Sequence, residues 1–117
     1  GSIEQITHDH SYVQYLVDMG KLTPEEAKSS SNRNIITRAV GTGDNLEADI
    51  ENIELPASDK KTYFLLCSDG LTNMVSDEDI AEEVSSDGTP EEKVNSLIAK
   101  ANENGGSDNI TVVLLER

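Results

Sequence analysis

One apolar run constrains the fold of this chain more than any other stretch. It covers Tyr63-Phe64-Leu65-Leu66-Cys67 and stops at Ser68-Asp69-Gly70. A strand with one wet face alternates polar and apolar residues, whereas an unbroken run is typical of a strand covered on both faces in a layered fold. We therefore expect a buried strand that carries Asp69 to its solvent-facing end. Because Asp and Gly also end ordinary strands, a simple turn is the alternative interpretation of this segment.

A second carboxylate stands at the opposite end of a second apolar run. Gly106-Ser107-Asp108-Asn109 leads directly into Ile110 to Leu115. If the two strands pair antiparallel, the end of the first meets the start of the second, and Asp69 and Asp108 converge at one edge of the sheet. Oxygen ligands suit Mg²⁺ or Mn²⁺, whereas zinc prefers histidine and thiolate. The two motifs together predict a site for a hard cation.

These two motifs resemble those of the metal-dependent serine/threonine protein phosphatases of the PPM, or PP2C, family, in their bacterial form. The resemblance rests on Cys67 to Leu71 and Gly106 to Thr111. Thr7-His8-Asp9-His10-Ser11-Tyr12-Val13 and Arg33 to Gly41 add two further segments in the family's order. The N-terminal half of the family carries an Asp-Gly-His-Gly-type segment that bridges two metals, and this chain has no counterpart of it. The chain therefore resembles the C-terminal half of such a phosphatase.

The resemblance implies a fold and a division of the chain. The expected fold class is α+β, as a partial αββα sandwich with a mostly antiparallel sheet and covering helices. Residues 1–117 would form the C-terminal portion of a single PP2C-like domain. Within it, residues 8–40 would be a flap-like region and residues 44–117 the sheet with its helices. Half of a sandwich leaves an apolar face or a strand edge uncovered, so we also expect self-association.

The resemblance also implies an activity for the parent enzyme. It would hydrolyse phosphoserine and phosphothreonine in proteins, counteracting a serine/threonine kinase, with a binuclear Mn²⁺ or Mg²⁺ centre. Asp69 and Asp108 would be metal ligands, and Asn109 a donor that orients Asp108. Beyond these ligands the resemblance assigns no catalytic side chain here, and the chain alone should lack activity. The alternative is a noncatalytic pseudophosphatase or an acidic protein-interaction module.

Charge and cysteine content narrow the possible partners and the compartment. The chain has 117 residues, of which 23 are acidic and 9 basic, for a formal net charge of −14. Such a charge repels nucleic acid and anionic membrane surfaces, so we expect neither as a partner. No apolar stretch is long enough to span a bilayer. The single cysteine, Cys67, is predicted to be a small buried hydrophobic residue, and this usage fits a reducing cytoplasm.

Local signals predict the remaining elements. We expect helices at residues 12–19 after Ser11, from residue 24 to about 28 after Thr23, from Ser76 to about Val84, and at residues 90–104 after Thr89. Residues 34–40 should be a strand or an extended segment, residues 48–55 a strand with a bulge, and residues 56–61 a turn. His8 and His10 could bind a metal, but two histidines without further ligands are more often surface or capping residues.

Overall fold

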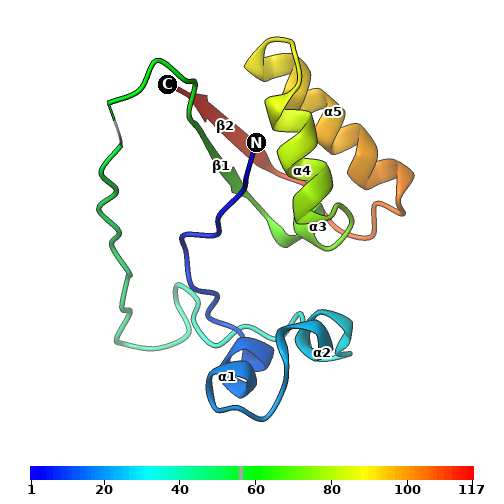
Figure 1. Ribbon diagram of the computed structural model, residues 1–117. Helices are drawn as coiled ribbons and strands as arrows, with labels where there is room; N and C mark the ends of the chain where they lie inside the picture. The colour runs from blue at the N-terminus through cyan, green and yellow to red at the C-terminus, as the bar shows by residue number, and fades with distance from the viewer. Residues whose placement is uncertain (56) are drawn as a thin grey trace. The chain divides into compact units, whose positions relative to one another are not determined.

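The computed structural model describes residues 1–55 and 57–117, so Pro56 in the predicted turn lies outside the described residues. The chain divides into two compact units (Figure 1). One unit contains residues 5–54. The other contains Gly1–Glu4 together with Leu55–Arg117, and it includes both apolar runs.

The unit of residues 5–54 is built on two short helices. Helix α1 covers Tyr12–Asp18 and helix α2 covers Pro24–Ser29. Ser11 and Thr23 cap them by accepting hydrogen bonds from the backbone N–H three residues later, at 3.2 and 3.1 Å. These bonds satisfy amides that the first turn of a helix otherwise leaves unpaired. Both predicted helices are confirmed.

The sequence predicts a strand or an extended segment at residues 34–40, and the structure has no regular strand there. In residues 34–40 only Ile36 forms a bridge, to Ser11. The prediction of a bulged strand at residues 48–55 is wrong, because these residues, all of them described, form no strand. Apolar residues alternate at Ala48 and Ile50 and again at Ile53 and Leu55, with a break at Asn52, but the side chains of Ile50 and Ile53 stay exposed. Alternation predicts a strand only where a neighbour completes the hydrogen-bonded ladder, and the described residues supply no such neighbour here.

The other unit is organised by a two-stranded antiparallel sheet. Strand β1 covers Tyr63–Cys67 and strand β2 covers Val112–Glu116. Tyr63 lies opposite Glu116 and Cys67 opposite Val112, so the end of β1 meets the start of β2. One further backbone bond, from the N–H of Ser68 to the carbonyl of Thr111 at 3.0 Å, extends the pairing toward the two predicted metal motifs.

Three helices lie on one side of this sheet (Figure 1). They are α3 at Asp69–Thr72, α4 at Asp77–Ser85 and α5 at Pro90–Glu103. The core beneath them consists of Leu71, Val75, Ile80, Leu97 and Ala101, with Leu65 and Val112 of the sheet packed against it. The α+β class is therefore confirmed. The helix predicted from Ser76 to about Val84 and the helix predicted at residues 90–104 are confirmed too. Sequence signals missed the short helix α3.

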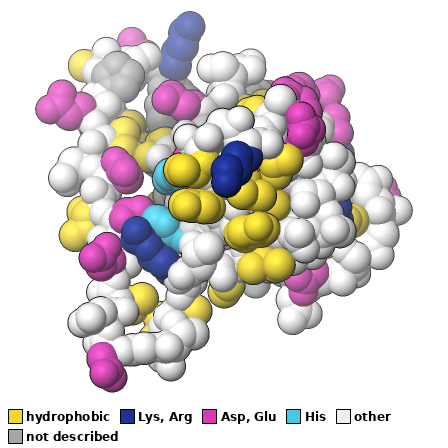
Figure 2. Space-filling view, turned by 90° about the horizontal axis from the view of Figure 1, so that it is seen from below, with side chains coloured by type: hydrophobic (Ala, Val, Ile, Leu, Met, Phe, Trp, Pro, Cys, Tyr) yellow, Lys and Arg dark blue, Asp and Glu magenta, His cyan; other side chains and the backbone are white. Residues whose placement is uncertain are grey.

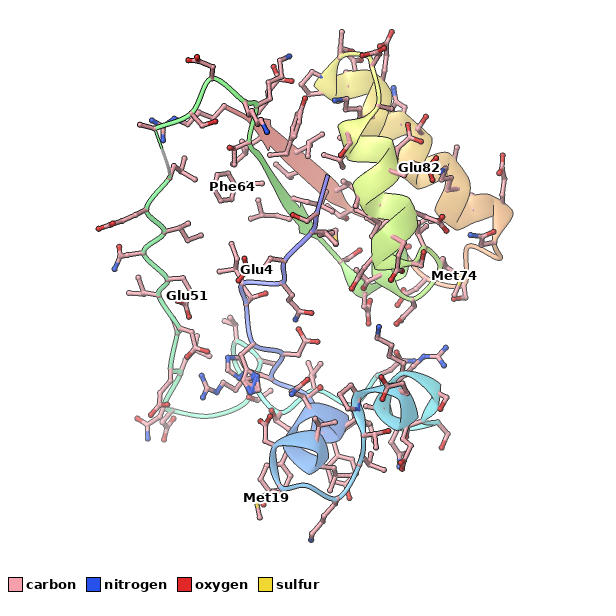
Figure 3. All side chains as sticks on the ribbon, viewed as in Figure 1. Glu4, Met19, Glu51, Phe64, Met74 and Glu82 are labelled. Carbon is pink, nitrogen blue, oxygen red and sulfur yellow. The ribbon has the colours of Figure 1, made fainter. Side chains whose placement is uncertain are left out.

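The opposite face of the sheet is not covered by helices. Pairing places Phe64 beside Leu115 and Leu66 beside Val113 on this face. In Figure 3 the labelled Phe64 points away from α4 and α5. Leu66 is 56% exposed, Val113 49% and Leu115 54%. Within the unit that contains the sheet, helices cover one face, and on the other face Phe64 is half-buried while Leu66, Val113 and Leu115 stay exposed. The prediction that β1 is covered on both faces is therefore wrong for this unit.

A search of the described helices for one long and apolar enough to cross a membrane found none.

A buried lysine joins α5 to its neighbours in the core. Lys93 is 3% exposed, and its Nζ donates to the carbonyl of Val84 at 2.7 Å and to the hydroxyl of Tyr63 at 2.9 Å. The ammonium also lies 4.3 Å from the centre of the Tyr63 ring. A cation near the last carbonyls of α4 is favourable because these groups carry partial negative charge. Lys93 therefore connects two helices and a strand.

We expect Lys93→Ala to destabilise the fold by about 2 to 3 kcal/mol, because the truncation removes a buried stem and leaves the Val84 carbonyl without its donor. Lys100→Ala, also on α5, is the matched control. Lys100 is part-exposed and pairs with Glu83 at 3.5 Å, so its loss should cost at most about 1 kcal/mol. Urea unfolding followed by circular dichroism measures both. Equal losses would contradict a special role for Lys93.

Candidate metal centre

The structure brings the two predicted metal motifs to the same end of the sheet. Asp69 is the first residue of α3, directly after β1 and Ser68. Asp108 lies in the connection between α5 and β2. Both side chains are exposed. The antiparallel register therefore brings the two motifs together at one end of the sheet. The convergence of the two carboxylates and their assignment as metal ligands stay predictions.

The two motifs touch through groups that flank the carboxylates. The Ser68 hydroxyl donates to the carbonyl of Asn109 at 3.1 Å and accepts from the N–H of Thr111 at 3.0 Å. Gly70 is buried, and a methyl group in place of its hydrogen would overlap the carbonyl oxygen of Asn109. Only glycine permits this approach of the two backbones. The residues immediately before and after Asp69 thus both contact the second motif.

Asp108 is oriented by its own loop. Its Oδ1 accepts a hydrogen bond from the backbone N–H of Asn109 at 2.7 Å. Such bonds from an Asp side chain to nearby backbone amides stabilise turns. Asn109 therefore orients Asp108 through its main chain, and a part for its side chain stays a prediction.

The donor set fits part of a coordination shell. Two carboxylates are hard oxygen donors, which Mg²⁺ and Mn²⁺ prefer. Among the described residues, however, no three or more His, Cys, Asp or Glu side chains gather to hold an ion. The acidic residues at the start of α4 include Asp79, whose N–H donates to Ser76 at 3.2 Å as part of a helix cap. The chain thus offers two candidate ligands at an open sheet end.

Two hollows of the described surface lie away from the candidate centre. One, of about 660 Å³, lies between residues 1–3 and α4. The other, of about 350 Å³, lies in the smaller unit and is lined by residues of the stretches 7–10, 38–40 and 46–51, including His8 and His10. Neither is lined by Asp69 or Asp108. Because both carboxylates are exposed, the candidate centre lies at an exposed edge of the sheet.

Comparison with known proteins decides the family. The protein phosphatase PhpP of Streptococcus pneumoniae is 45% identical over 111 residues, which cover 95% of this chain and 44% of the relative. The solved serine/threonine phosphatase of S. agalactiae superposes with a TM-score of 0.88 at 42% identity, over 97% of this chain and 46% of that one. The chain belongs to the PPM-type serine/threonine phosphatases. It spans less than half the length of these relatives. A scan of family models gave no match.

One PPM relative has been solved with metal. The catalytic domain of the serine/threonine protein phosphatase PstP is described as a complex with two manganese ions. It is 43% identical to this chain, with a TM-score of 0.77 over 94% of this chain and 43% of that one. This supports manganese as a metal of the family.

The histidines of this PPM chain contact carboxylates. His8 Nε2 lies 2.9 Å from Asp18 Oδ2, and His10 Nε2 lies 2.8 Å from Asp49 Oδ2. Arg38 adds a contact to Asp49 at 3.2 Å. Figure 2 shows histidine beside basic and acidic side chains. Burial acts to raise the pKa of Asp49, but the hydrogen bond from Arg38 and the charges of His10 and Arg38 hold that pKa below its usual value.

Cys67 is exposed, so its predicted burial is wrong. It is the last residue of β1, at the open end of the sheet beside the candidate centre. Partial burial of the thiol nevertheless raises its pKa, and the negative charge of Asp77 raises the pKa further. Both effects disfavour the thiolate. Cys67 is therefore accessible but weakly nucleophilic near neutral pH.

We expect Asp77→Asn to speed the alkylation of Cys67 by iodoacetamide severalfold at mildly alkaline pH. Removing the negative charge lowers the pKa of the thiol, so more thiolate is present at a given pH. Asp87→Asn, in the connection between α4 and α5, removes the same charge and is the control. Mass spectrometry of the modified chain gives the rates across pH. An equal acceleration in both variants would contradict the local effect of Asp77.

Proposed function

We propose that this chain supplies Asp69 and Asp108 to a binuclear Mn²⁺ or Mg²⁺ centre of an enzyme that hydrolyses phosphoserine and phosphothreonine in proteins. The observation that carries the proposal is the meeting of the two carboxylate motifs at one end of the β1–β2 sheet, in a chain of the PPM family. The manganese complex of PstP supports the choice of metal. The exposure of both carboxylates supports it too, because ligands must reach an ion outside this unit's core.

Each residue would contribute in its own way. Asp69 is the first residue of α3 and follows the end of β1 by two residues, so regular structure fixes its backbone. Asp108 offers a carboxylate whose Oδ1 is already oriented by the Asn109 amide. When bound, the metals would lower the pKa of water and neutralise charge on the phosphoryl oxygens. The side chains described here contribute oxygen ligands to that arrangement and hold them in place.

The same proposal fixes the substrate class and setting. The proposal includes phosphoprotein substrates, which the similarity to protein phosphatases supports. It also includes a serine/threonine kinase as the opposing enzyme and residues 8–40 as a flap. A cytoplasmic location rests on the single cysteine, which suits a reducing compartment. The net charge of −14 argues against a nucleic-acid partner.

We expect Asp69→Asn and Asp108→Asn each to weaken Mn²⁺ binding by about fivefold or more, because each removes a charged oxygen ligand. Asp77→Asn is the matched control, since it removes one negative charge near the same end of β1 but belongs to the cap region of α4. Titration of Mn²⁺ followed by electron paramagnetic resonance measures the three dissociation constants. Equal weakening in the control would favour a noncatalytic acidic module over a metal site.

The 117-residue chain alone should show negligible turnover of an aryl phosphate in the presence of Mn²⁺. The reason is that two carboxylates fill only part of an ion's shell of about six ligands, and no third candidate ligand joins them in the described chain. Release of nitrophenolate measures turnover. Clear turnover that disappears in Asp69→Asn would show that this chain suffices for catalysis and would contradict the expectation.

We also expect the isolated chain to self-associate through the uncovered sheet face of Phe64, Leu66, Val113 and Leu115. Exposed apolar faces favour burial, and added salt should strengthen the association by screening the net charge. Sedimentation velocity at rising concentration measures it. Val113→Lys should restore the monomer, whereas Asn95→Lys, at an exposed position of α5, should not. A strict monomer at high concentration and moderate salt would count against this proposal.

A further inference from the structure

The hydroxyl of Ser68 behaves differently from those of the other residues that precede helices in the described chain. The N-cap side chains of α1, α2, α4 and α5 each accept a bond from the backbone N–H three residues later; they are Ser11, Thr23, Ser76 and Thr89. Ser68 is the N-cap of α3, yet its side chain makes no capping bond. Its hydroxyl is therefore used for a purpose other than starting a helix.

That hydroxyl spans the gap between the two metal motifs. It donates to the carbonyl of Asn109 and accepts from the N–H of Thr111, while the N–H of Ser68 donates to the carbonyl of Thr111. A serine hydroxyl has one donor hydrogen, and here it is directed at the second motif. Ser68 is thus fixed to residues 109–111 by backbone and side chain together.

The position of Ser68 makes these hydrogen bonds relevant to the carboxylates. Ser68 directly precedes Asp69 in the chain, and its hydrogen-bond partner Asn109 directly follows Asp108. On the far side of Asp69, Gly70 packs against the same Asn109 carbonyl with no room for a side chain. The Asn109 peptide is therefore held from both sides of Asp69. Displacing it would move Asp108 relative to Asp69.

We propose that Ser68 is a positioning residue that sets the spacing of the Asp69 and Asp108 carboxylates through its bridge to Asn109 and Thr111. The expected effect of Ser68 on metal affinity rests on the proposed function. The hydrogen-bonded bridge itself does not depend on that function, because it joins protein groups only. Ser68 itself is no metal ligand in this arrangement.

The test compares Ser68→Ala with Ser68→Thr and with Ser76→Ala, using the whole chain. Amide hydrogen exchange of Thr111, measured without metal, reports the bridge. The Mn²⁺ dissociation constant reports the spacing. Ser68→Ala should speed exchange at Thr111 and raise the Mn²⁺ dissociation constant at least about threefold, as expected for loss of a group that orients a ligand. Ser68→Thr keeps a hydroxyl and should restore most of both properties.

The control separates positioning from stability. Ser76→Ala also deletes a serine hydroxyl at an N-cap, and should lower the unfolding midpoint without changing either readout. If Ser76→Ala raises the Mn²⁺ dissociation constant as much, general destabilisation explains the effect and the inference is wrong. If Ser68→Ala leaves that constant unchanged while Asp69→Asn raises it, the inference is wrong and the metal site stands. If Asp69→Asn changes nothing, the proposed function fails and the positioning role fails with it.

Discussion

The pairing of β1 with β2 is the interaction on which the rest of this structure depends. It joins residues 63–67 to residues 112–116, and all three helices of the larger unit lie between them in the sequence. The register sends Leu65 and Val112 toward the helices and Phe64 and Leu115 to the other face. A slip of one residue would exchange the two faces of the slipped strand, because side chains alternate along it. The same register puts both carboxylate motifs at one end.

The helices hold this register from one side only. Leu97 and Ala101 of α5 are fully buried, and Lys93 on the same helix reaches the end of α4 and the ring of Tyr63. Because Tyr63 begins β1, this contact anchors the strand at the end opposite to Asp69. Ser68 and Gly70 anchor the other end to the start of β2. The strand is therefore fixed at both ends.

The features that could be predicted from the sequence are those with local causes. Capping residues predict α1, α2, α4 and α5, and an apolar stripe supports α1, α4 and α5, because each of these signals lies within a few turns of the helix start. The meeting of the two motifs could also be predicted, since it requires only that two apolar runs pair antiparallel. The assignment of Asp69 and Asp108 as ligands depends on the family resemblance in addition, and the geometry alone is compatible with it.

The features that escaped prediction depend on distant neighbours. Covering β1 on its second face, or completing a strand at residues 48–55, requires partners that the described residues do not supply. A lysine in a helix is expected at the surface from the sequence alone, and Lys93 is buried only because α4, α5 and β1 meet around it. Ser68 precedes α3, a helix that the sequence signals missed, and its hydroxyl bonds to the Asn109 carbonyl in place of capping that helix.

The long sequence separation between β1 and β2 also governs when the candidate centre can exist. Helices α4 and α5 are neighbours in the chain, so their contact closes only a short loop, whereas the sheet must close over the whole segment from Cys67 to Val112. Contacts of high separation form late in folding because the chain entropy they cost is repaid only at the end. A partly folded chain would expose apolar strands while its two carboxylates remained apart. If the chain binds a divalent cation as proposed, that affinity would appear only in molecules that have completed the sheet, and the ion would then report finished folding.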